Sequence, residues 1–205
     1  GFIPAALIWL QLHGGFPFFG ILIAFMVLTL GITVLDPRVR FRFDPSDSPV
    51  RSLLQKVFLR LLLSAGVLTL LTVCVYPDLF LQLPRERPRI WLMVMCLYPL
   101  LSVAPQEFIF RGFFMQRYQP LFGEGRTMLW VNALVFGWTH VFFLNAVAPL
   151  LSIIAGYLLA STWRQSKSFW LVCLEHAVYG QIVFTTGLGW FFYNGTARAI
   201  VDSLH

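Results

Sequence analysis

The feature that most constrains this fold is a run of predominantly apolar residues from Phe16 to Leu35. It has about the twenty residues that a helix needs to cross a bilayer. Five further apolar runs follow, at residues 53–75, 90–104, 128–143, 145–162 and 169–193. Hydrophobic residues make up 58% of the 205, more than the roughly half that is typical of soluble domains. The chain is therefore expected to enter a membrane repeatedly.

Only helices or closed barrels satisfy their backbone polar groups in lipid. The runs therefore predict an all-α, polytopic transmembrane helix bundle with about six spans. A shorter apolar segment at residues 2–12 adds a partial or interfacial helix. No linker or repeat divides the chain, so residues 1–205 are expected to form a single integral-membrane domain.

Charged residues are only 12% of the chain, with a formal net charge of +6, and they gather between the apolar runs. A basic balance in loops favours contact with anionic membrane lipids over nucleic-acid binding. The loop 36–56 is predicted to face the cytoplasm, since it carries several arginines. A second basic loop, Pro84–Arg89, falls on the opposite side by simple alternation, which conflicts with that rule. We expect an integral protein of a bacterial or archaeal cytoplasmic (inner) membrane.

Few ionisable residues interrupt the apolar runs. Those at membrane depth are Glu107, Arg111, His140, Glu175 and His176. Such side chains are costly to place in lipid and by default mark a functional site between helices. A carboxylate with a histidine can activate water, and a second histidine can donate to a developing oxyanion. These residues therefore predict a hydrolytic site.

Structural explanations compete with this hypothesis. Glu107 and Arg111 stand four residues apart and can form an intrahelical pair. His140 and His176 can each be a core histidine bonded to a neighbouring helix. Glu175 is expected to partner a buried cation or to reach an interface rather than to react, because its neighbour His176 points about 100° away around the helix.

Familiar protease motifs are missing from the sequence. It contains no H-E-x-x-H, no G-x-S-x-G and no Gly-x-Gly-Asp, which disfavours serine and aspartyl chemistry. One Glu and two His form an acceptable zinc ligand set, but they lie on separate helices. A zinc protease therefore stays as an alternative.

The ordered set of Glu107-x-x-x-Arg111-Gly112, Phe136-x-x-x-His140 and a late His176 resembles the CPBP family. These are glutamic intramembrane proteases, also called Abi proteins or type II CAAX prenyl endopeptidases. The resemblance covers a protease-like core at about residues 90–193. It implies that Glu107 with His140 polarises a water, that Arg111 holds the carboxylate and that His176 stabilises the oxyanion. It implies no metal and no cofactor.

Two positions depart from the family pattern. Gln106 stands where the family usually has a first Glu, which is commonly assigned as the base. Gly180 stands where the late motif usually has Asn, and Gln181 is the nearest amide that can replace it. Gln106, Gln181 and Glu175 are therefore supporting candidates.

The leading hypothesis is an endopeptidase that cleaves a membrane-associated peptide or protein. Its substrate would be a prenylated tail, a sorting or anchor segment, or a leader peptide. The alternatives are the zinc-dependent protease and a membrane scaffold or immunity protein that has lost catalysis.

Overall fold

The computed structural model describes residues 18–35 and 50–192 of the chain. Within these ranges the regular elements are helices, and no strand occurs. The prediction of an all-α membrane bundle is confirmed. The predicted helix at residues 2–12 and the part of the basic loop from 36 to 49 lie outside the described residues.

The helices follow one another with short connections. The α-helices are α2 (Phe18–Leu35), α3 (Val50–Val75), α4 (Gln82–Glu86), α5 (Pro88–Tyr98), α6 (Ala104–Glu107), α7 (Met115–Phe122), α8 (Arg126–Trp138), α9 (Val147–Ser166) and α10 (Phe169–Thr186). Pro99–Val103 and Phe108–Phe114 are π-helical, whereas Pro77–Leu79, Val141–Phe143 and Leu188–Phe192 are 3₁₀-helical.

The segments from α5 to α7 join into one long helix, Pro88–Phe122. Pro105 lies in the first turn of α6, where its missing N–H is tolerated. The long helix thus continues beyond the apolar run 90–104 and ends at Phe122. A π segment lies on each side of α6, and such wide turns occur frequently at functional sites.

By length and composition, three described helices can cross a membrane: Arg51–Val75, Pro88–Phe122 and Val147–Ser166. Gly20–Leu35 is a shorter apolar helix, and α8 has only 13 residues. Fewer described helices therefore meet the criterion for a span than the six that the sequence suggests. The outer face of α3 carries exposed large apolar side chains, among them Phe58, Leu59, Leu63 and Leu70. Such a face suits contact with lipid.

Two predicted boundaries are wrong. The expected span at residues 128–143 ends as an α-helix at Trp138, so His140 lies in the turn that follows. The expected loop Pro84–Arg89 is largely helical. The first boundary is set by the turn after Trp138, and the second by Pro88 at the start of α5. The hydrophobicity of the surrounding residues does not indicate either one.

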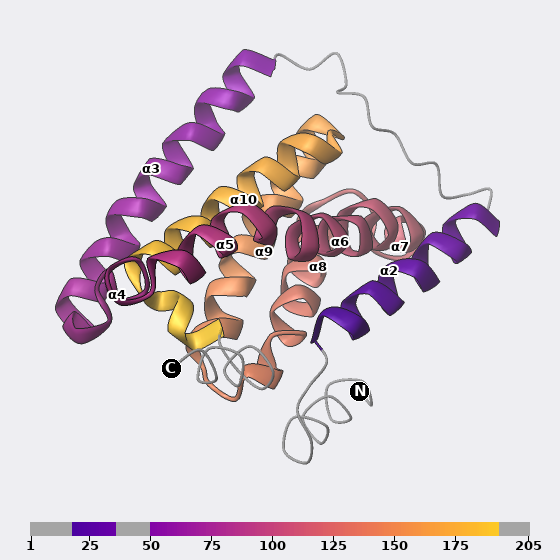
Figure 1. The fold of residues 1–205 in the computed structure, drawn as a ribbon. Helices are drawn as coiled ribbons and strands as arrows, with labels where there is room; N and C mark the ends of the chain where they lie inside the picture. The colour runs from indigo at the N-terminus through magenta and orange to yellow at the C-terminus, as the bar shows by residue number, and fades with distance from the viewer. Residues whose placement is uncertain (1–17, 36–49, 193–205) are drawn as a thin grey trace.

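The long helix formed by α5, α6 and α7 crosses the middle of the bundle (Figure 1). α3 lies at one side and α2 at the other, with α5, α6 and α7 crossing between them. α10 packs against α3, α5 and α9, whereas α2 packs against α6 and the adjoining π segments. α6 therefore lies within the bundle, where its side chains are shielded from lipid.

α8 and α9 pack closely because Gly156 lacks a side chain. A Cβ at Gly156 would lie 3.1 Å from both Cα of Ala133 and Cδ1 of Phe136. Small residues at such contacts let helix backbones approach in membranes. The close approach brings the Gly156 carbonyl and the Phe136 ring next to the long helix.

Candidate active site

Glu107 is the last residue of α6, and its side chain is completely buried. Nη1 of Arg111, equally buried, donates to Oε1 of Glu107 at 3.0 Å. The predicted pairing four residues along the helix is therefore present. A buried carboxylate requires such a charged partner because isolated ions are strongly disfavoured away from water.

His176 on α10 reaches the same carboxylate oxygen. Its Nδ1 lies 2.6 Å from Oε1 of Glu107, a distance typical of a charge-assisted hydrogen bond. Oε2 of Glu107 has no hydrogen-bond partner among the described residues. One oxygen of the carboxylate is thus fixed by two donors, and the other is left to accept a hydrogen bond from a ligand.

Arg111 is held by more than Glu107. Its Nη2 donates to the carbonyl of Gly156 at 3.2 Å, and its guanidinium lies 4.6 Å from the ring centroid of Phe136. Cation–π contacts of this kind are strongest where water is excluded. Arg111 therefore fixes Glu107 relative to both α8 and α9.

His140 lies one aromatic ring away from this cluster. Its Nδ1 donates to the carbonyl of Phe136 at 2.8 Å, so Nε2 of the neutral imidazole is an acceptor. The Phe136 ring contacts both imidazoles, with centroid distances of 4.8 Å to His140 and 5.7 Å to His176. The structure thus joins Glu107, Arg111 and His176 directly and places His140 on their border.

Gln106 is buried beside Glu107 but has a different partner. Its Nε2 donates to Oγ of Ser102 at 2.7 Å, and its Oε1 has no partner among the described residues. An amide at this position cannot act as a base, so Glu107 is the carboxylate that this segment contributes.

Gln181 binds the backbone of α5 instead of completing the His176 motif. Its Nε2 donates to the carbonyl of Met95 at 3.0 Å. In a regular helix that carbonyl would accept from the residue four positions later, but this residue is Pro99, which has no N–H. Gln181 therefore satisfies a carbonyl that a proline leaves open.

Glu175 belongs to a second polar cluster between α3 and α10. Its Oε1 accepts from the hydroxyl of Tyr179 at 3.1 Å and lies 3.9 Å from Nη1 of Arg60. Nη1 of Arg60 also donates to Oγ1 of Thr162 at 3.2 Å. The prediction that Glu175 partners a cation is confirmed, and the cation is Arg60 of α3.

Sequence reasoning missed Tyr98. Its hydroxyl lies 3.2 Å from Nε2 of His176, on the side of the ring away from Glu107. Two residues in the sequence could have drawn attention to this contact. Tyr98 places a hydroxyl within an apolar run, and Gly180 leaves a position without a side chain one helical turn after His176. The sequence could not show that the two meet.

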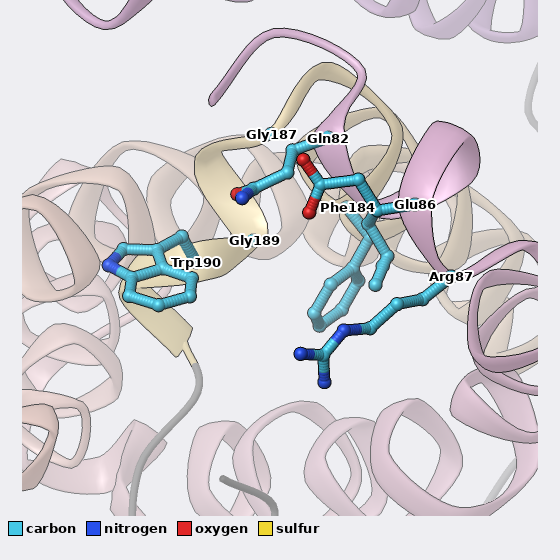
Figure 2. Close-up of a pocket in the computed structure, with 8 residues that line it drawn as sticks. Gln82, Glu86, Arg87, Phe184, Gly187, Gly189 and Trp190 are labelled. Carbon is cyan, nitrogen blue, oxygen red and sulfur yellow. The ribbon is translucent and has the colours of Figure 1, made fainter. Parts of the chain in front are cut away.

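A small cavity of about 60 Å³ lies apart from these residues, between α4 and the 3₁₀ turn after α10. Figure 2 shows Arg87, Glu86 and Trp190 around it. Phe184 is its nearest link to the cluster, because its ring also contacts Tyr98 edge to face at 5.4 Å. The candidate active site is therefore a buried polar cluster rather than this cavity.

No group of three or more His, Cys, Asp or Glu residues in the described chain is arranged to hold a metal ion. Glu107 and His176 do lie together, but the Phe136 ring packs against both imidazoles. The zinc hypothesis therefore gains no support from the placement of its ligand set.

Comparison with known proteins found one family. The model described as Type II CAAX prenyl endopeptidase Rce1-like, which represents a protease family, matches residues 88–182. This range begins with α5 and includes the cluster around Glu107 and His176. No curated protein and no solved structure matches the chain. Over residues 88–182, just under half of the 205, the chain is therefore similar to the Rce1-like family of type II CAAX prenyl endopeptidases.

Proposed function

We propose that the chain is a membrane endopeptidase in which Glu107 activates a water molecule for attack on a peptide bond. The observation that carries this proposal is the asymmetry of the buried carboxylate. Oε1 is bound by Arg111 and His176, whereas Oε2 has no partner among the described residues. A buried polar atom without a protein partner calls for an explanation, and a bound water is one of them; at Glu107 that water would be the reactant. Oε2 of Glu175 is likewise unpartnered, but no histidine bonds that carboxylate in the part of the chain that the structure describes.

Each neighbour then has a distinct task. Arg111 and His176 hold Glu107 in one orientation, which spares the reaction the entropy of positioning its base. Glu107 takes a proton from water through Oε2 and later returns it to the leaving amine. His140 lies at the edge of the site, against the Phe136 ring. Its unprotonated Nε2 is a second hydrogen-bond acceptor for the same water.

The substrate class follows from the family and from the membrane helices. A member of the type II CAAX prenyl endopeptidase family is expected to act on a membrane-associated protein or peptide. We propose a prenylated C-terminal tail as the first substrate to test, with unprenylated anchor segments and leader peptides as comparisons.

The test uses the full chain in lipid nanodiscs with a farnesylated, fluorogenic peptide. The Glu107→Gln variant keeps the shape of the side chain but removes the base, so turnover should fall at least about 100-fold. Glu124→Gln is the matched control, because Glu124 is exposed and bonds only Gln119 among the described residues. Equal turnover by the parent and Glu107→Gln, both folded, would refute the proposal.

A scaffold without catalysis is the second candidate, favoured by the amide at Gln106 where a carboxylate is usual. It predicts that the parent has no turnover and that Gln106→Glu creates it. The proposed mechanism predicts instead that the parent turns over substrate with Gln106 in place. The same assay therefore separates the two candidates.

A further inference from the structure

Tyr98 makes a direct contact with the proposed site from the end of α5. Its hydroxyl lies 3.2 Å from Nε2 of His176, and the two rings meet edge to face with centroids 6.1 Å apart. Since Nδ1 of His176 is bound to Glu107, both ring nitrogens have partners. His176 therefore has no third position from which to bind a substrate oxygen.

Gly180 makes the position of Tyr98 possible. A Cβ at Gly180 would lie 2.2 Å from Cε1 and 2.6 Å from the hydroxyl oxygen of Tyr98. A rigid ring cannot yield to such an overlap. The Tyr98 ring and a side chain at position 180 are thus mutually exclusive occupants of one space.

α10 forms a slot for this ring along one face. His176, Gly180 and Phe184 are spaced four residues apart, so they lie on the same side of the helix. Phe184 contacts the ring edge to face at 5.4 Å. The ring is therefore held from both sides, and its hydroxyl is directed at the imidazole.

A hydroxyl donates one hydrogen bond and accepts up to two. Because Nδ1 of His176 donates to Glu107, a proton on Nε2 as well makes the ring an imidazolium paired with the Glu107 carboxylate. In that state the Tyr98 oxygen accepts from Nε2, and the hydroxyl hydrogen is free to donate elsewhere. Hydrogen bonds connect Glu107 to His176 and His176 to Tyr98. The Tyr98 hydroxyl is then the donor at the end of this chain of hydrogen bonds, away from Glu107. A peptide carbonyl lying along the His176 ring would meet the Glu107 water with its carbon and the Tyr98 hydroxyl with its oxygen.

We infer that Tyr98 is a catalytic residue whose hydroxyl donates to the oxyanion of the tetrahedral intermediate, in the space that Gly180 leaves open. The inference rests on the proposed function and deepens it. It also explains why Gln181, the nearest amide on α10, is free to bind the Met95 carbonyl instead.

The step balances with water as the only co-reactant. The water oxygen bonds to the carbonyl carbon, its proton passes to Oε2 of Glu107, and the carbonyl π electrons move to the oxygen that Tyr98 stabilises. When the C–N bond breaks, the C=O bond re-forms and the amine nitrogen takes the proton from Glu107. The O–H bond of Tyr98 is never broken.

The first test is Tyr98→Phe, which keeps the ring and its packing. Losing one donor to an oxyanion should lower kcat about 100-fold or more and leave KM within about twofold. Tyr118→Phe is the matched control, since Tyr118 is exposed and stacks on Phe114. A purely structural ring predicts an unchanged kcat in Tyr98→Phe, and that result would overturn the inference.

The second test removes the Tyr98 ring and places a side chain at position 180 in the space that the ring occupied. Tyr98→Ala should lose kcat as Tyr98→Phe does, and adding Gly180→Asn should restore part of it, because an amide donor then enters the vacated space. No recovery in the double variant, with its fold intact, counts against the shared space.

Failure of this inference is distinct from failure of the proposed function. If Glu107→Gln abolishes turnover while Tyr98→Phe does not, only the role of Tyr98 falls. If the parent is as inactive as Glu107→Gln, both fall together.

Discussion

Nδ1 of His176 meets Oε1 of Glu107 at 2.6 Å although 69 positions separate the two residues in the chain. The contact joins α10 to α6, and the bond from Arg111 to the Gly156 carbonyl adds α9. The proposed base is thus positioned by tertiary packing as well as by Arg111 of its own helix. Substitutions that loosen this packing should therefore affect stability and turnover together.

Removing Arg111 should be the most damaging of these substitutions. Arg111→Met leaves the buried Glu107 carboxylate without its cation, which typically costs about 3–5 kcal/mol. The cost is measured as the free energy of unfolding in mixed micelles titrated with SDS. The double variant Arg111→Met with Glu107→Gln removes both charges and should be less destabilised than Arg111→Met alone. A double variant that is as unstable as the sum of both single variants would contradict the pairing.

Two glycines should respond oppositely to the same change. Gly156→Ala brings a Cβ to 3.1 Å from the Ala133 backbone and from Phe136, and such overpacking costs about 1–3 kcal/mol. Gly66→Ala, on α3, meets no heavy atom within 4 Å, and should stabilise its helix by about 0.5–1 kcal/mol. Thermal unfolding of both variants checks the signs. Destabilisation of Gly66→Ala as large as that of Gly156→Ala would contradict the packing argument.

The bond from Gln181 to the Met95 carbonyl should matter only because residue 99 is proline. Gln181→Leu leaves that carbonyl without its donor, at a cost of about 1–3 kcal/mol. Adding Pro99→Ala supplies an N–H four residues after Met95 and should recover much of the loss. Unfolding of the single and double variants measures the recovery. Its absence would show that Gln181 stabilises the protein in another way.

The cluster of Arg60 and Glu175 should be structural. Arg60→Met and Glu175→Gln should each lower the unfolding free energy, and the double variant should lose less than their sum, because each single change strands a partner. With kcat measured on the folded fraction, neither variant should approach the loss of Glu107→Gln. A comparable loss in kcat would move this cluster into the active site.

The helical class and the residues of the cluster could be predicted because both depend on the cost of polarity in lipid. Apolar runs predict helices, and ionisable side chains within them predict convergence. That logic located Glu107, Arg111 and His176, which the structure joins. It also anticipated a cation for Glu175 without identifying Arg60.

Other features depend on geometry that one sequence does not encode locally. The end of α8 at Trp138 places His140 in a turn, yet the surrounding residues are as apolar as a span. The contact between Tyr98 and His176 depends on the packing of α5 against α10. The partner of Gln181 depends on a carbonyl opposite Pro99, which becomes apparent only when both helices are placed.

The two π segments that flank α6 make the orientation of Glu107 tolerant of a change in chain length. Each wide turn accommodates an additional residue, whereas in a regular α-helix each residue rotates the next by about 100°. A single deletion within Pro99–Val103 would therefore close the wide turn into an α-helical one and leave Glu107 directed at α10. The same deletion within the regular helix α10 would rotate His176 relative to the residues before the deletion, so the two halves of the site differ in how they tolerate a change of one residue.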